Sequence, residues 1–292
     1  MGTNASYGGS SSKDWKTVRE LWGGLGPSDL PSSSGGSDDG ASPGDVPLPQ
    51  DYQASPSLDA LGKALADALG KGLQGASKGN VPLVSLLPRR TSRGSGGGGA
   101  GGASGGGSTG TSGNSGRTGT GSRQVQRQAA RGGAAIGAAV AYRDRDGAAL
   151  AEYGTTLEAL DAMTPRQRNI AILDLVLGDA GHPDEAAVRA AALEQVKALG
   201  TEAGKARDAA EAVRSFVGQL VVQIGLVELR DQYAAGAATR QEIKRRETSL
   251  RQWVASKVHH LDLAKYGRVT SRDCHKTAFR MAADALRLMR KK

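Results

Sequence analysis

Residues 94–121 constrain the fold of this 292-residue chain more than any other stretch. They contain 15 glycines in 28 positions, and the other residues are nearly all Ser, Thr and Ala. Ordering such a stretch would cost roughly 30–50 kcal/mol of conformational entropy, with almost no apolar surface to offset the loss. The sequence therefore predicts a Gly/Ser linker over residues 94–122, between an N-terminal region, 1–93, and a C-terminal region, 123–292.

The N-terminal region is rich in Gly, Ser and Pro and is predicted to be largely disordered, apart from two short amphipathic helices. Apolar residues recur at helical spacing in 14–25, and a leucine stripe in 57–73 follows a predicted N-cap at Ser57. Helices this short are marginal in water, so each is expected to dock on the C-terminal region, to dock on a partner protein or to remain transient, and the sequence leaves these alternatives open. The apolar positions are Trp15, Val18 and Trp22 in the first segment and Leu58, Leu61, Leu65, Leu69 and Leu73 in the second.

From residue 123 onward, apolar residues recur continuously at spacings of three and four, which is typical of helices. No window of alternating β-branched residues competes with this pattern, so the predicted fold class is all-α, with a C-terminal bundle of about seven helices. The expected helices span 123–143, 147–163, 165–178, 184–199, 201–235, 239–263 and 270–290. The fifth is predicted to be the buried centre of the bundle, through Ala206, Ala210, Val213, Val217, Leu220, Ile224 and Val227.

Composition excludes several classes of protein. The single cysteine, Cys274, rules out an intrachain disulfide framework and a cysteine-based zinc cluster. The longest apolar stretches are shorter than the ~18–20 residues of a membrane-spanning helix, and the start lacks a basic segment followed by an apolar one. We therefore expect a cytoplasmic protein that needs no cofactor and does not enter a membrane.

The net charge of +9 is concentrated at one end, because residues 239–292 carry 15 Lys/Arg against 5 Asp/Glu. One interpretation is a binding face for nucleic acid or for an acidic protein, and the other is a solvated helical surface. No aromatic residues interleave with the charges and no helix-turn-helix or zinc-finger signature accompanies them, so nucleic acid is the less favoured partner. In the last predicted helix the apolar stripe is Cys274, Ala278, Met281, Ala285 and Leu288, and the possible basic binding face is Arg272, Lys276, Arg280, Arg287 and Arg290.

The sequence contains no signature of catalysis: no HExxH, no phosphate-binding loop, no GxSxG and no paired Cys or His at metal-ligand spacing. His259–His260 and Cys274–His275 are adjacent pairs, and adjacent side chains on a helix point about 100° apart. We interpret the histidine pair as surface residues and Cys274 as a buried inert thiol. The acidic residues after Pro183 are interpreted as the first turn of a helix. The sequence therefore predicts a non-enzyme.

The opening MGTNASYGG consists mostly of small and polar residues. Removal of Met1 would leave Gly2 at the terminus, with an α-amino group whose pKa of about 8 leaves part of it unprotonated at neutral pH. Together with the acidic, Pro-rich stretch DDGASPGDVPLPQDY at 38–52 and the Ala/Arg-rich helical half, this opening resembles the QatB family, components of the Qat anti-phage defence system of bacteria. Family members often continue the opening with Gly-Gly-Pro, whereas this chain has Gly8-Gly9-Ser10.

The resemblance implies three partners: an ATPase, a TatD-like nuclease, and an enzyme similar to the 7-cyano-7-deazaguanine synthase QueC, which uses ATP to join a carboxylate to an amine. We expect an adaptor or scaffold whose exposed Gly2 is modified by the QueC-like enzyme. The alternatives are that the opening is a docking peptide or an unselective start, or that the chain is a nucleic-acid-binding helical protein. The expected recognition segment is Thr3, Asn4, Ser6, Tyr7, Gly8 and Gly9.

Overall fold

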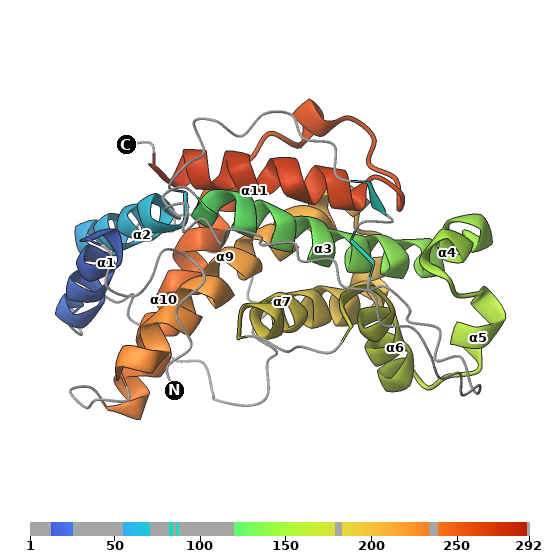
Figure 1. The fold of residues 1–292 in the computed structure, drawn as a ribbon, viewed down its shortest axis with the longest axis horizontal. Coiled ribbons are helices and arrows are strands. Elements are labelled where there is room, and N and C mark those ends of the chain that lie inside the picture. The colour runs from blue at the N-terminus through green and yellow to red at the C-terminus, as the bar shows by residue number, and fades with distance from the viewer. Residues whose placement is uncertain are drawn as a thin grey trace, which may run out of the picture.

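The computed structural model describes residues 13–25, 55–70, 82–83, 86–87, 120–178, 183–233 and 239–290. The regular structure of these residues is helical, with no strand among them, which confirms the all-α prediction (Figure 1). The helices are α1 (Lys13–Gly24), α2 (Pro56–Leu69), α3 (Thr120–Arg143), α4 (Gly147–Tyr153), α5 (Leu157–Asp161), α6 (Pro165–Leu177), α7 (Pro183–Leu199), α8 (Glu202–Lys205), α9 (Ala209–Tyr233), α10 (Arg240–His259), the 3₁₀ helix η4 (Leu263–Tyr266) and α11 (Cys274–Arg290).

Two of the predicted long helices are broken in the structure. The segment 147–163 divides into α4 and α5, because Gly154 ends α4 in the left-handed conformation and Thr156 caps the start of α5. The segment 201–235 divides into α8 and α9. The helical periodicity of the sequence continues across both breaks and does not reveal them. The described residues between 120 and 290 form nine α-helices, where about seven were predicted.

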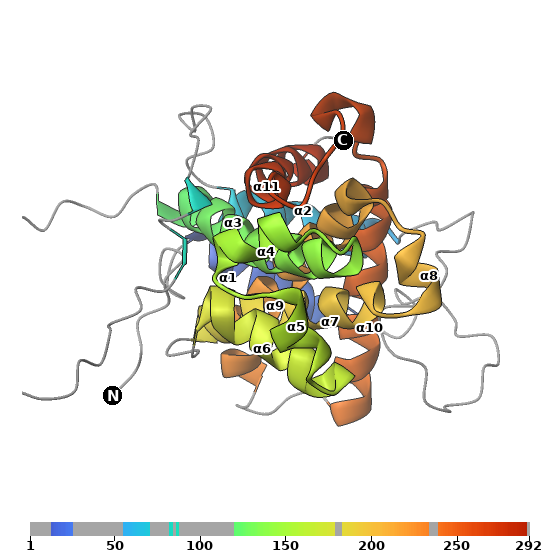
Figure 2. The same ribbon diagram turned by 90° about the vertical axis from the view of Figure 1, so that its right-hand side faces the viewer.

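Helix α3 lies at the centre of the fold, in contact with α4, α6, α7, α9 and α11. Its run GGAAIGAAVA, residues 132–141, is buried along its whole length. Glycine lets α11 approach the backbone of α3: a Cβ on Gly133 would lie 2.4 Å from Ala278 Cβ and 2.8 Å from the carbonyl oxygen of Cys274. This apolar run is therefore a helix-packing surface. Helices α4, α5 and α6 gather at the end of α3 that lies away from α1 and α2 (Figures 1 and 2).

Helix α9 is buried against α3, α7, α10 and α11, as the fifth predicted helix was expected to be. Ala206 was wrongly assigned to its apolar stripe: it is exposed at the end of α8, before the chain turns into α9. The window Ala209–Val227 is long and apolar enough to cross a membrane, and 67% of it is buried inside the helical body. Its apolar residues therefore form part of the hydrophobic core. The expectation that every apolar stretch is shorter than a membrane-spanning helix is wrong for this window.

Helix α1 packs on α2, and α2 packs on α3, α10 and α11, so among the alternatives left open both segments dock within the chain. Trp15, Trp22, Leu58, Leu61, Leu65 and Leu69 all belong to the same buried cluster as α3, α9 and α11. The aromatic ring of Trp253 covers Gly62, since a Cβ there would lie 2.2 Å from Trp253 Cη2. The N-cap of α2 is Ser55, before Pro56 at the first helical position, and not Ser57 as predicted.

The docking of α1 and α2 changes the role expected of the Gly/Ser linker. Residues 88–119 lie outside the described residues, and α3 begins at Thr120, slightly before the predicted end of the linker. Since α2 and α3 belong to one buried cluster, the linker joins two parts of one helical body. The segment that precedes this body is residues 1–12.

Candidate functional site

The predicted modification site Gly2 and the recognition segment Thr3, Asn4, Ser6, Tyr7, Gly8 and Gly9 lie outside the described residues. Helix α1, which follows this segment, is held by buried apolar side chains and by a hydrogen bond from α10. Trp15, Val18 and Trp22 of α1 are buried, and Arg246 Nη1 on α10 donates a hydrogen bond of 2.9 Å to the carbonyl oxygen of Trp22. The N-terminal segment therefore meets the body at one defined place, the start of α1.

The side of α2 that faces the C-terminal helices carries two acidic residues, and each meets a basic one. Asp59 Oδ1 accepts a hydrogen bond of 2.6 Å from Trp253 Nε1 and lies 3.3 Å from Lys257 Nζ. Asp67 pairs with Arg290 at 2.9 Å. Arg290 also donates to the carbonyl oxygens of Ala66 and Asp67 at the end of α2. These polar contacts fix the orientation of α2 on the apolar surface of α10 and α11.

The five residues of the predicted basic face do not form a free cationic surface. Arg272 pairs with Glu152 of α4 at 2.7 Å, Lys276 with Asp273 at 3.7 Å, and Arg287 with Asp284 at 3.1 Å. Arg290 is bound to α2 as described above. Of these five, Arg280 forms no ion pair with a described residue, and it is exposed. Within the apolar stripe of α11, Leu288 is half-buried and its neighbours Leu286 and Met289 are buried.

Arginines elsewhere in the structure are directed at the C-terminal ends of other helices. Arg143 donates to the carbonyl oxygens of Gly204 and Arg207 at the end of α8, and Arg214 donates to that of His259 at the end of α10. Cations at helix C-termini satisfy unpaired carbonyls and oppose the negative end of the helix dipole. Arg246 of α10 and Arg290 of α11 likewise bind carbonyl oxygens at the ends of α1 and α2, so these arginines serve contacts within the fold.

The end of α6 is capped in the same way by two arginines. Arg131 donates 2.9 Å hydrogen bonds to Leu177 O and to Glu185 Oε1, while Arg189 donates to Gly178 O at 2.8 Å and pairs with Asp174. These side chains line a shallow surface depression with no enclosed space for a water molecule. Glu185 lies in the first turn of α7, which confirms the interpretation of the acidic residues after Pro183.

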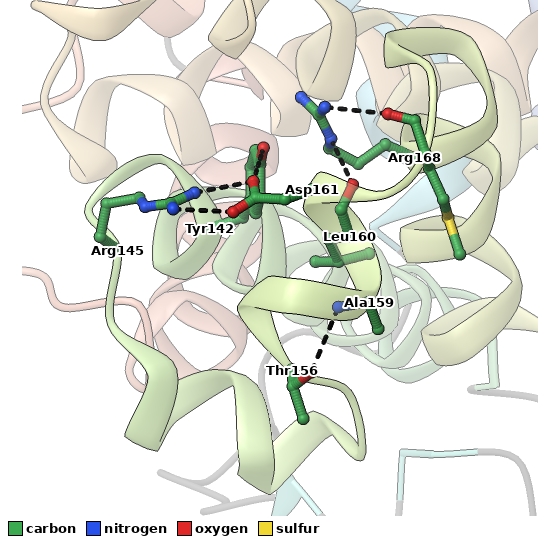
Figure 3. A network of polar contacts seen from close by, with 8 residues as sticks. Tyr142, Arg145, Thr156, Ala159, Leu160, Asp161 and Arg168 are labelled. Carbon is green, nitrogen blue, oxygen red and sulfur yellow. Dashed lines mark hydrogen bonds and ion pairs between the residues drawn. The ribbon is translucent and has the colours of Figure 1, made fainter.

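A second group of polar contacts joins the end of α3 to α5 and α6 (Figure 3). Arg145 binds both oxygens of Asp161, at 2.8 and 2.7 Å, and Tyr142 donates its hydroxyl to the same carboxylate at 2.7 Å. The guanidinium of Arg168 lies 4.5 Å from the centre of the Tyr142 ring and donates to Leu160 O and Met163 O. Hydrogen bonds from Arg145 and Tyr142 lower the pKa of Asp161 to about 2. This network fixes α5 on the end of α3, and both oxygens of the Asp161 carboxylate accept hydrogen bonds within it.

The remaining chemical candidates do not converge. Cys274 is buried, donates to Thr270 O, and has its pKa raised to about 12 by burial, so its thiolate is not accessible at neutral pH. His259 and His260 are exposed at the end of α10 with ring centroids 6.2 Å apart. The described residues contain no group of three or more His, Cys, Asp or Glu placed to hold a metal ion.

The polar contacts that hold α1 and α2 were not predicted from the sequence. Arg246 and Trp253 are seven residues apart on α10 and so share a helical face, which is the one signal that could have linked them. The chain matches no protein-family model, no curated protein and no solved structure.

Proposed function

We propose that this chain is a non-catalytic adaptor of a bacterial anti-phage defence system, which presents its N-terminal segment to a QueC-like enzyme. The observation that supports this proposal best is the fixation of α1, through buried Trp15 and Trp22 and the Arg246 hydrogen bond. Residues 1–12 precede this helix in the chain and have a contour length of roughly 40 Å. A short segment on a fixed helix suits delivery to the cleft of a partner enzyme.

In the proposed reaction, the amine of Gly2 attacks a carboxylate that the QueC-like enzyme has activated with ATP. An amide bond forms, the activating group leaves, and the amine loses a proton. The residues expected to be recognised are Thr3 to Gly9. The ATPase and the TatD-like nuclease, also implied by the resemblance, are the other proposed partners, and the compartment proposed is the cytoplasm.

Intact-mass measurement tests the proposal. The chain is produced with and without the QueC-like enzyme and its neighbouring proteins, and the N-terminal peptide is compared by fragmentation. We expect an added mass on Gly2 in the co-produced sample alone. Gly2→Leu is the matched control, since a bulky second residue retains Met1 and removes the acceptor glycine. An identical N-terminal peptide in both wild-type samples would refute the proposal.

The alternative function, nucleic-acid binding by the basic C-terminal helices, receives less support. Four of the five candidate residues, Arg272 before α11 and Lys276, Arg287 and Arg290 on it, have acidic partners within 4.0 Å, as described above. If the chain did bind with six to ten phosphate contacts, its affinity would fall by roughly three to five decades between about 50 and 200 mM salt. A flat or absent response would remove this alternative.

A further inference from the structure

The first two turns of α10 carry basic side chains on their outward side. Arg240, Lys244 and Arg245 are exposed, and we call them the cationic face of α10. Arg246, on the other side of the same turns, is buried and holds α1. Within the described part of the chain, none of the three exposed residues forms an ion pair, in contrast to the paired residues of α11.

The chain that joins α1 to α2 starts and ends beside this helix. The end of α1 is held by Arg246, and the start of α2 is held by Trp253 and Lys257 through Asp59. Along α10, Arg246 and Lys257 are about 16 Å apart, and the cationic face extends about 9 Å from Arg246 toward the start of the helix. Residues 26–54 have a contour length of roughly 100 Å, so they can reach every part of the face.

This connection is also complementary to the face in charge. Residues 26–54 contain five aspartates and no Lys or Arg. Attraction between exposed charges extends over about 8 Å at physiological ionic strength, and both ends of the connection are already fixed within reach of α10. The aspartates are Asp29, Asp38, Asp39, Asp45 and Asp51.

We propose that the cationic face of α10 is the docking surface for the acidic connection, residues 26–54 of the same chain. The contact shields the face from external polyanions, so that the charge of Arg240, Lys244 and Arg245 is neutralised within the chain. The strongly basic composition then has two internal uses: arginines that cap helix ends, and a face that is covered by the chain's own aspartates.

Carbodiimide cross-linking of the full-length chain tests this proposal, because the reagent joins a carboxylate to a lysine amine only when the two are in contact. Lys244 is the amine within the cationic face. We expect peptides joining Asp38, Asp39 or Asp45 to Lys244 to be the main cross-links of the connection at low salt. Their yield is expected to fall at least about fivefold in about 0.5 M NaCl, which screens exposed ion pairs.

A matched pair of double variants separates the face from the rest of the basic surface. The variant with Arg240→Gln and Arg245→Gln keeps Lys244 but loses two charges of the face, and its Lys244 cross-links are expected to fall at least about threefold. The control with Arg268→Gln and Arg280→Gln removes two exposed arginines outside α10 and should leave the yield unchanged. Cross-links that go mainly to Lys13, Lys16 or Lys257, or equal yields in the two variants, would overturn the proposal.

Discussion

At the scale of single residues, close helix packing depends on glycines that leave no room for a side chain. Gly133 on α3 and Gly218 on α9 are both inside long helices, but a Cβ on Gly133 would lie 2.4 Å from Ala278 Cβ, whereas one on Gly218 would lie 3.7 Å from Val258. We predict that Gly133→Ala lowers the free energy of unfolding by about 1–3 kcal/mol through overpacking, and that the control Gly218→Ala raises it by about 0.5–1 kcal/mol. Urea titration of both variants measures the difference. Equal effects would contradict the packing of α11 on α3.

The Asp161 network makes a prediction about pH. The pKa of Asp161 is lowered from 3.8 to about 2 by hydrogen bonds from Arg145 and Tyr142. Its stabilising contribution is therefore fully present above pH 3.8 and is lost as the pH falls through about 2. NMR titration of the Asp161 carboxyl carbon should give a midpoint near this lowered value, and Arg145→Gln should move the midpoint back toward 3.8. A wild-type midpoint already at the ordinary value would refute the bidentate contact.

At the scale of helices, the contact between α10 and α1 is expected to depend on one buried guanidinium. Arg246→Met removes the donor to the Trp22 carbonyl oxygen, and we predict a loss of about 1–3 kcal/mol in the free energy of unfolding. The tryptophan fluorescence of native protein should shift to longer wavelength as α1 loosens. Arg245→Met is the matched control, because Arg245 is exposed and such changes stay within about 0.5 kcal/mol. Equal losses of stability in the two variants would contradict the role of the Arg246 hydrogen bond to Trp22.

The helical segments themselves could be predicted from sequence, but not what covers them. The Trp15, Val18 and Trp22 spacing and the Leu58 stripe correctly marked the faces of α1 and α2 that are buried. Periodicity identifies a buried face without identifying its partner, so the docking on α10 and α11 could not be derived. The Arg246 and Arg290 contacts join residues 224 positions apart, and no local pattern encodes such a pair.

The positive charge of residues 239–292 was interpreted differently from the sequence, because the partners of these residues come from distant parts of the chain. The sequence shows that residues 239–292 are basic, but a count of charges does not show which of them meet an acidic group or a helix end. The partners come from other turns and other helices, such as Glu152 of α4 for Arg272 and Asp67 of α2 for Arg290. The predicted binding face thus contains residues that hold the fold together.

At the scale of the whole molecule, the account depends on α1 and α2 belonging to the same packed body as α3 to α11. The hydrophobic cluster includes side chains from both sides of the Gly/Ser stretch, among them tryptophans of α1 and leucines of α2. The Asp59–Trp253 and Asp67–Arg290 contacts also hold α2 on the C-terminal helices. The proposed presentation to a partner then concerns residues 1–12, which precede α1 in the chain.

Cleavage of the Gly/Ser stretch tests this claim most directly. A protease site is introduced between residues 100 and 110 of the full-length chain, which is cut under native conditions and analysed by size-exclusion chromatography with mass detection. We predict that the two fragments stay together with the 29.9 kDa mass of the intact chain and separate only in denaturant. Separation of the fragments in native buffer would contradict the account.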